Sequence, residues 1–251
     1  MNSAPAYNWI IPDWPAPSWV RAITTTRLGG VSQGPYTAMN LGDHVEDQPE
    51  AVADNRQHLR DTLALPAEPV WLRQVHGRGI VMADQAAPNP EGDGAVSFSP
   101  GHVCAVLTAD CLPVLLCDRA GTRVGAVHAG WRGLADGVIE AGIDALEMPG
   151  SSLMAWLGPA IGPQAFEVGD EVRSAFVAHD PAAATAFQPQ RDRWHANLYQ
   201  LARERLAARG ITEVYGGDYC TYTDHERFYS YRRDGVTGRM ATLIWLEGTR
   251  D

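Results

Sequence analysis

The chain of 251 residues is 45% hydrophobic, which fits one large domain or two small ones built around a substantial core. No apolar stretch approaches the roughly 20 residues of a membrane helix, and the N-terminus lacks the features of a secretory signal, so we expect a cytoplasmic protein without a membrane partner. The formal net charge of −10 argues against nucleic-acid binding, and because all twenty cationic side chains are arginines, Schiff-base and P-loop lysine chemistry are excluded.

The first nineteen residues have a composition of their own. They contain four prolines and three tryptophans, a combination typical of extended chain that lies against the protein body. We predict residues 1–19 as an extended N-terminal segment and residues 20–251 as a single catalytic domain, because no linker or internal repeat divides the rest of the chain.

Apolar patterning predicts strands and helices that are interspersed along this domain. Strands are predicted where short runs are β-branched or continuously apolar, at residues 21–27, 70–75, 79–83, 102–108, 113–118, 123–129, 152–158, 213–217 and 240–247. Helices are predicted where apolar residues recur at helical spacing, at residues 49–64, 133–148, 168–180 and 197–210. Residues 84–95 have the composition of a loop. This order of elements indicates an α/β or α+β domain with more than one layer.

The four cysteines differ in their surroundings. Their spacings contain no C-x-x-C pair, which excludes a zinc ribbon and a thioredoxin motif. Cys104 and Cys117 fall inside apolar strands, so we predict both as small buried residues of the core. Cys111 is different, because it follows Asp110 and precedes a strand that begins with proline.

Three side chains with metal-binding or nucleophilic chemistry follow predicted strands: His76, Cys111 and His128. If these strands are neighbours in one sheet and run in the same direction, the three side chains converge at one edge, where α/β proteins place their sites. Two imidazoles and one thiolate form a ligand set for zinc and leave the fourth tetrahedral position open for water or substrate. Such a site is catalytic rather than structural, because zinc supplies hydroxide at neutral pH.

Their spacing alone leaves other uses of the same groups open. Cys111 could act as a nucleophile with His128 as its base, helped by the start of the helix that follows. A blue copper centre would use two histidines, a cysteine and an axial methionine, of which only Met82 lies near in the sequence. Asp110 has two interpretations, as a capping residue of a turn or as a group that orients the ligands or transfers a proton.

Several arginines lie close to these segments in the sequence. The guanidinium group matches phosphate and carboxylate geometry, so an anionic or polar substrate group is a natural partner. The candidates are Arg27, Arg132, Arg232, Arg233 and Arg239. A surface ion pair with one of the thirty acidic residues explains each of them equally well.

Eight sequence blocks occur in an order that resembles a known family. They are TTTRLGGVSQGPYTAMNLG, NR at 55–56, RQVHG, DGAV, TADCLPVLLCD, GAVHAGWRG, WLGPAIGPQAFEVGDEV and FYSYRRDGVTGRMATLIWL. Together they are similar to the laccase-domain proteins, also called peptidoglycan editing factors or multicopper polyphenol oxidase-like proteins, over residues 20–247. The TADC and VHAGWRG blocks are the most specific of the set.

The resemblance implies a single layered α/β/β/α domain with mixed sheets, of the cysteine-hydrolase-like type. It also implies that His76, Cys111 and His128 bind a metal, which is zinc with copper as the alternative. The implied activity is phosphorolysis of adenosine, inosine, guanosine and methylthioadenosine, with deamination of adenosine. Two alternatives come with it: an amidase that edits UDP-linked muropeptide precursors in peptidoglycan synthesis, and a copper-dependent phenol oxidase, or laccase.

We therefore predict a metal-dependent enzyme that acts on a small molecule, with no nucleic-acid partner and as a monomer or weak homodimer. The partner is a purine nucleoside with phosphate, or a UDP-linked muropeptide precursor. The predicted catalytic residues are His76, Asp110, Cys111 and His128. The predicted substrate-binding residues are Arg27, Asn40, Gln74, Arg132, Arg232 and Arg239.

Overall fold

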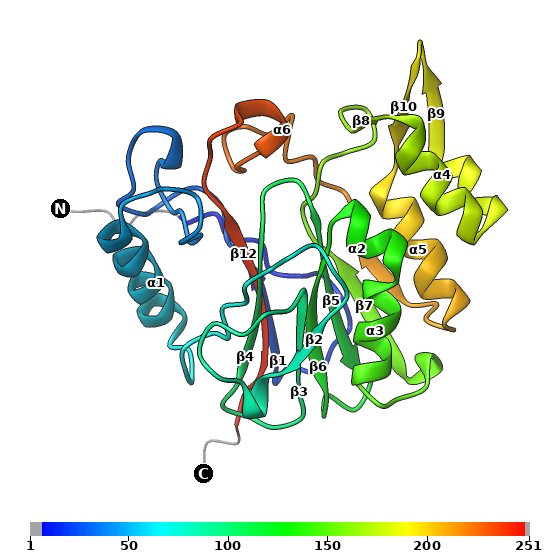
Figure 1. The fold of residues 1–251 in the computed structure, drawn as a ribbon. Coiled ribbons are helices and arrows are strands. Elements are labelled where there is room, and N and C mark those ends of the chain that lie inside the picture. Colours follow the sequence, from blue (N-terminus) through cyan, green and yellow to red (C-terminus); the bar gives the residue numbers. More distant parts are fainter. Residues whose placement is uncertain (1–6, 249–251) are drawn as a thin grey trace.

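The structure, a computed structural model, describes residues 7–248 and has a mixed α/β fold, as the sequence predicts. Figure 1 shows two neighbouring sheets in the middle of the molecule, with α1 on one side and α2, α3 and α5 on the other. The helices are α1 (Pro49–Leu63), α2 (Trp131–Asp136), α3 (Val138–Ala145), α4 (Asp170–His179), α5 (Leu198–Ala208) and α6 (Tyr231–Asp234). Single 3₁₀ segments lie at Gly34–Tyr36, Ala83–Gln85, Gly150–Ser152 and Pro181–Ala186.

The strands form two large sheets of different composition. The smaller one is antiparallel, in the order β1 (Val20–Thr24), β12 (Met240–Leu246) and β4 (Val103–Thr108). The larger one has six strands, in the order β11 (Val214–Gly216), β7 (Leu153–Leu157), β5 (Leu112–Asp118), β6 (Val124–Ala129), β3 (Gly94–Ser97) and β2 (Ile80–Met82). It is antiparallel in its centre and parallel at both edges, where β2 pairs with β3 and β11 pairs with β7.

The two sheets pack face to face through completely buried side chains. Cys104 and Ile244 of the three-stranded sheet belong to the same apolar cluster as Leu115 and Ala126 of the six-stranded sheet. Cys117 lies in this cluster too, so the prediction that Cys104 and Cys117 are core residues is confirmed. Burial raises the pKa of the Cys117 thiol to about 12, which keeps it protonated and unreactive at neutral pH.

Helices cover the outer faces of both sheets. Leu59 of α1 packs with Leu243 of β12 on the outer face of the three-stranded sheet. Ile139 of α3 and Leu201 of α5 pack with Val127 of β6 on the outer face of the six-stranded sheet. The layers therefore follow the order α/β/β/α that the resemblance implies, because each sheet buries one face against the other sheet and one face against helices.

Residues 133–148 are predicted as one helix, but the structure divides them into α2 and α3 at Gly137. The backbone of Gly137 has φ = +95°, a left-handed conformation that glycine adopts without a steric penalty. The turn ends α2, and a side chain from another element reaches the last carbonyls of the helix.

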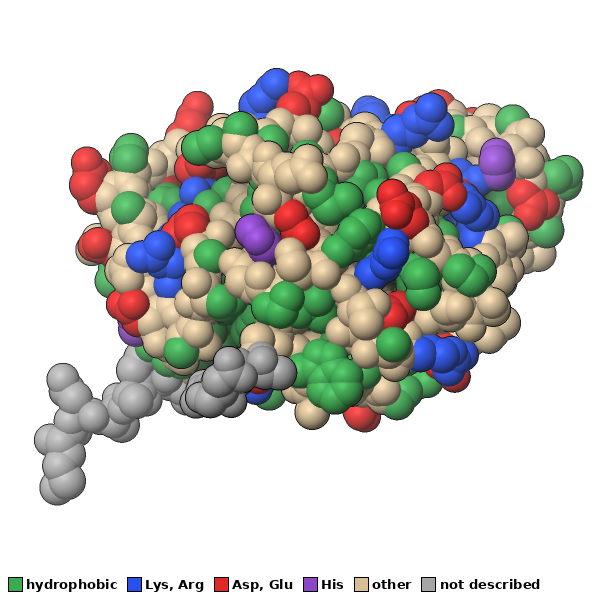
Figure 2. Space-filling model, turned by 90° about the horizontal axis from the view of Figure 1, so that it is seen from below, with side chains coloured by type: hydrophobic (Ala, Val, Ile, Leu, Met, Phe, Trp, Pro, Cys, Tyr) green, Lys and Arg blue, Asp and Glu red, His purple; other side chains and the backbone are tan. Residues whose placement is uncertain are grey.

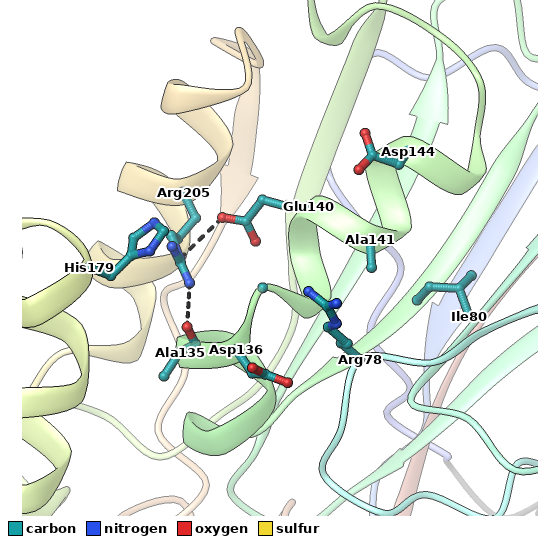
Figure 3. Close-up of a pocket in the computed structure, with 10 residues that line it drawn as sticks. Arg78, Ile80, Ala135, Asp136, Glu140, Ala141, Asp144, His179 and Arg205 are labelled. Carbon is teal, nitrogen blue, oxygen red and sulfur yellow. Dashed lines mark hydrogen bonds and ion pairs between the residues drawn. The ribbon is translucent and has the colours of Figure 1, made fainter.

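That side chain is the buried Arg205 of α5. Its Nη2 donates to the carbonyl oxygens of Leu134 and Ala135 at 2.8 and 2.7 Å, and its Nε lies 3.2 Å from the carboxylate of Glu140 in α3 (Figure 3). One guanidinium thus joins three helices. A pocket of about 730 Å³ lies beside this junction and is also lined by Arg78 and His179.

Residues 70–75 are predicted as a strand, and this prediction is wrong. Val70 forms an isolated bridge with Cys104 of the three-stranded sheet, and Arg73 forms another with Glu91, close to the start of β3 in the six-stranded sheet. The segment crosses from one sheet to the other, so it cannot pair continuously with either. It delivers His76 from a loop instead of from a strand end.

Other elements have little apolar patterning and are not predicted. The largest is a small sheet in the order β8 (Glu167–Val168), β10 (Arg193–Ala196) and β9 (Phe187–Gln190), which projects from the body beside α4 in Figure 1. Strand β3 begins inside the predicted loop over residues 84–95, and the four-residue α6 is also missing from the prediction.

The N-terminal segment is described from residue 7 onward, and residues 1–6 of the predicted extended segment lie outside the described part. Residues 7–19 contain no helix, Ile10 bridges Thr24 of β1, and Trp14 packs against the core between the sheets. Within residues 7–248 no helix has the length and apolar character needed to cross a membrane. Figure 2 shows basic and acidic side chains interspersed on the face seen from below.

Candidate metal centre

His76 lies in a loop that wraps around one carboxylate. The main-chain N–H groups of Val75, His76 and Gly77 donate to the two oxygens of Asp93 at 3.2, 2.9 and 2.7 Å. His76 itself has φ = +59°, which is uncommon for a residue other than glycine and is typical of functional sites. The three hydrogen bonds hold this backbone in place and leave the imidazole exposed.

Cys111 lies in the connection that leads from β4 in one sheet to β5 in the other. The residue before it, Asp110, has φ = +94° and is buried. Its carboxylate accepts from the hydroxyl of Thr221 at 2.6 Å and from the N–H of Arg232 at 2.7 Å, and its carbonyl accepts from the N–H of Ile161 at 2.9 Å. Asp110 therefore ties three segments together and positions Cys111, which favours its interpretation as an orienting residue over proton transfer.

His128 ends the buried strand β6, and its ring is fixed by Asp93. The Nδ1 atom of His128 lies 2.9 Å from Oδ1 of Asp93, and both side chains are buried. Burial alone would raise the pKa of Asp93, but hydrogen bonds from His128 and the N–H of Gly77 lower it below its usual value. An ionised Asp93 accepts the proton on Nδ1, so Nε2 is the ring nitrogen that a metal ion would bind in place of a proton.

The structure brings His76, Cys111 and His128 together. Their ligand atoms all lie within 4.8 Å of one another, and Sγ of Cys111 is 3.9 Å from Nε2 of His76. A Cβ on Gly130 would lie 3.0 Å from both Cys111 and His76, so any larger residue at this position would crowd the donors.

The convergence arises differently from the predicted arrangement of parallel strand ends. β5 and β6 are antiparallel neighbours, so the start of β5 next to Cys111 meets the end of β6 at His128. β4 belongs to the other sheet, and His76 follows no strand. The three donors therefore converge without following neighbouring strands of one sheet that run in the same direction.

The donor set fits zinc. With Zn–S and Zn–N bonds of about 2.3 and 2.0–2.1 Å, tetrahedral geometry separates a sulfur and a nitrogen donor by about 3.6 Å. The 3.9 Å between Cys111 and His76 is close to this separation. Three protein donors leave one position open, and the exposed side of His76 makes the centre accessible. Within residues 7–248 this is the one group of three or more His, Cys, Asp or Glu with such a geometry.

Cys111 and His128 shift each other's protonation. Burial raises the pKa of the Cys111 thiol, but the neighbouring His128 and hydrogen bonds from both histidines lower it to about 6. Burial lowers the pKa of His128, but the Cys111 thiolate and the Asp93 carboxylate raise it to about 9. The protein thus stabilises a thiolate at neutral pH, which is the form that binds metal ions.

Arg239 is a predicted substrate-binding arginine whose charge interacts with a donor of this centre. Burial lowers the pKa of its guanidinium, while Cys111 and Asp110 act in the opposite direction. Its Nη1 donates to the carbonyls of Thr237 and Gly238, both at 3.0 Å, so the half-buried side chain is held in place.

The guanidinium groups of the other candidate arginines contact carbonyl groups or an aromatic ring of the same chain. Arg27 donates to two main-chain carbonyls at 3.1 Å, Arg232 donates to one at 2.7 Å, and Arg233 donates to three. The exposed Arg132 lies over the ring of Trp131, 4.4 Å from its centroid. Their role in substrate binding stays a prediction.

The two amide residues predicted to bind substrate, Asn40 and Gln74, bond to main-chain groups of neighbouring segments. Asn40 is buried and accepts from the N–H of Arg239 at 2.9 Å, so it fixes the backbone of that arginine. Gln74 exchanges two hydrogen bonds with the main chain of Leu107 in β4, at 2.9 and 2.7 Å, and so anchors the loop of His76 to the three-stranded sheet. These contacts make both of them positioning residues.

Asp93 is the important residue that sequence reasoning leaves unassigned. It lies inside the predicted loop over residues 84–95, although the DGAV block contains it. The available signal is an acid directly before a short apolar run, since Gly94–Ser97 forms the buried strand β3. Its role depends on complete burial next to His128, which the sequence pattern does not reveal.

Comparison with known proteins agrees with this architecture. A Pseudomonas aeruginosa protein named purine nucleoside phosphorylase is 56% identical over 241 residues, covering 95% of this chain and 98% of the relative. The purine nucleoside phosphorylase YfiH of Escherichia coli is 52% identical over 238 residues, covering 94% and 98%. A solved Neisseria meningitidis structure, 51% identical, matches with a TM-score of 0.93 over 96% of this chain and 100% of that one.

The family comparison confirms the resemblance found in the sequence blocks. Residues 21–247 match the family model described as multi-copper polyphenol oxidoreductase laccase. This match spans both sheets, the helices that cover them and all three members of the His–Cys–His group. The chain therefore belongs to the multi-copper polyphenol oxidoreductase laccase family.

Proposed function

We propose that this protein is a metal-dependent purine nucleoside phosphorylase. The observation that carries the proposal is an open His–Cys–His centre in a chain whose relatives of 52–56% identity, aligned over nearly its whole length, bear that name. Deamination of adenosine, and adenosine, inosine, guanosine and methylthioadenosine as substrates, belong to the same proposal.

His76, Cys111 and His128 would hold the metal, for which zinc is the best match to two imidazoles and a thiolate. When bound in such a three-donor site, zinc acts as a Lewis acid toward an oxygen in its open position. Asp93 keeps the proton on Nδ1 of His128, and Asp110 keeps Cys111 at the junction of the two sheets. The chain therefore supplies a fixed centre whose exposed side can receive a substrate.

Phosphorolysis also requires a phosphate positioned against the anomeric carbon of the nucleoside. Arg239 is the candidate for this role, because its guanidinium is half-buried, its charge interacts with Cys111 and its backbone is fixed by Asn40. A guanidinium held in place binds phosphate oxygens at low entropic cost. The expected products are the free base and ribose 1-phosphate.

Incubation of the zinc-loaded protein with inosine or adenosine, with and without phosphate, tests the proposal. We expect hypoxanthine from inosine only when phosphate is present, and inosine from adenosine in its absence. Cys111→Ala should lose at least about 100-fold in rate, since metal ligands act as a unit. His179→Ala, an exposed histidine of α4, is the matched control and should retain activity. Absence of both products, or full activity of Cys111→Ala, would refute the proposal.

A further inference from the structure

Exposed apolar side chains gather on the segments that build the metal centre. Val75, which precedes His76, is 46% exposed. Tyr231, which begins α6, is 62% exposed, and Val236 in the loop from α6 to β12 is 58% exposed. Apolar groups left in water next to a polar centre are typical of ligand-binding sites, because a ligand covers them when it binds.

Tyr231 is the most exposed Phe, Tyr or Trp within residues 7–248, yet its backbone is firmly fixed. The N–H of the next residue, Arg232, donates to Asp110 at 2.7 Å, and Ser230 caps the first turn of α6 by accepting from Arg233. Figure 1 shows α6 at the same end of the molecule as the connection between β4 and β5. The turn that carries Tyr231 is therefore tied to the residue before Cys111, and its aromatic side chain meets solvent.

A cation lies within charge-interaction range of this side chain. The charge of Arg239 interacts with Tyr231 as well as with Cys111 and Asp110. One edge of that guanidinium donates to main-chain carbonyls, and within the described residues no partner is found for Nε or Nη2. The protein therefore offers an aromatic ring and a guanidinium that attracts anions. A ligand that fits them has a flat apolar face and binds together with an anion.

We infer that Tyr231 is a substrate-binding residue whose ring stacks on the purine base, while Val75 and Val236 line the rim of the same site. The inference rests on the proposed function and names the residue that contacts the base. Stacking on an aromatic side chain tolerates different bases, because every base offers a flat π face. It therefore suits an enzyme that accepts adenosine, inosine and guanosine alike.

Steady-state phosphorolysis of inosine by Tyr231→Ala and Tyr231→Phe tests the inference. A stacked base typically loses about 10-fold in affinity, or more, when its aromatic partner is removed. We expect Tyr231→Ala to raise the KM for inosine about 10-fold, with kcat and the KM for phosphate changed less than about threefold. Tyr231→Phe keeps the ring and should restore the inosine KM to within about twofold. A merely structural role would instead change kcat, both KM values and the melting temperature together.

Trp19→Ala is the matched control, since Trp19 is an exposed aromatic on the N-terminal segment. It should leave both KM values unchanged. An unchanged inosine KM in Tyr231→Ala, with an active wild type, would overturn the inference but leave the proposed function intact. A wild type without turnover would reject the proposed function, and equilibrium dialysis of inosine against both proteins would then measure the same contact directly.

A second copy of this chain is the competing occupant of the apolar rim. Sedimentation velocity of the wild type and of Tyr231→Ala distinguishes it from a substrate. We expect the same sedimentation coefficient for both proteins. A dimeric wild type that becomes monomeric in Tyr231→Ala, with an unchanged inosine KM, would show that the rim is an interface and would overturn the inference.

Discussion

Asp93 accepts hydrogen bonds from His128 and from three consecutive N–H groups of the loop that carries His76. One carboxylate thus orients two of the three donors. Asp93→Asn keeps the shape but removes the charge and part of the accepting capacity. We expect zinc affinity to fall about 10–100-fold, as observed when groups that orient metal ligands are removed. Competition with a chromophoric chelator measures the change.

Asp84→Asn is the control for this prediction. Asp84 accepts from Ser97 and Ser99 at the other end of β3 and touches none of the three donors. The variant should lose some stability but bind zinc as the wild type does. Equal zinc affinity for Asp93→Asn and the wild type would contradict the role assigned to Asp93.

The candidate site is only partly predictable from individual residues. The resemblance identifies His76, Cys111 and His128, and the structure brings them together, but their spacing alone leaves a nucleophilic cysteine equally open. Asp93 is unrecognisable in the sequence, because its function comes from burial among N–H groups that belong to a distant segment. Positive φ angles at His76 and Asp110 are likewise set by tertiary hydrogen bonds and not by local propensity.

At the scale of elements, Arg205 is the link between α5, α2 and α3. Arg205→Met would remove the guanidinium that contacts two main-chain carbonyls and the Glu140 carboxylate. Breaking a buried pair in this way costs about 3–5 kcal/mol. For a chain of this size that lowers the melting temperature by about 6–20 °C. Differential scanning calorimetry measures the shift.

Arg209→Met is the matched control, because Arg209 follows α5 directly and forms an exposed ion pair with Asp144. Surface pairs contribute about 0–1 kcal/mol, so the melting temperature should fall by no more than about 4 °C. Similar losses of melting temperature in the two variants would show that the buried junction stabilises the fold no more than an exposed ion pair does.

Strands are predicted well where their buried residues form a continuous apolar run in the sequence. β4, β5, β6 and β12 are continuous apolar runs and lie within one residue of the predicted bounds. Residues 70–75 begin with a similar apolar run but cross between two sheets, so an apolar run alone does not establish pairing. β9 is largely exposed, β10 is mostly half-buried, and neither has an apolar pattern, which explains why the small sheet is missed.

At the scale of the whole molecule, the three donors come from the six-stranded sheet, from the connection between the two sheets, and from a loop that is anchored to the three-stranded sheet. A ligand that binds only the folded state stabilises it by RT ln(1 + [L]/Kd), or about 2.7 kcal/mol at 100 times Kd. Zinc at that concentration should raise the melting temperature by about 5–11 °C, and a chelator should reverse the change. Cys111→Ser should abolish most of the shift, whereas an equal shift in this variant would place the metal elsewhere.

The position of Cys111 in the connection between β4 and β5 makes the centre sensitive to the distance between the sheets. His128 belongs to the six-stranded sheet, and the loop of His76 is anchored to Leu107 of the other sheet through Gln74. A core substitution such as Leu115→Ala, which lets the sheets approach or shift, would therefore change the coordination angles without touching a ligand. In a cobalt-substituted protein, a change in the visible absorption spectrum would then report a change in how the two sheets pack.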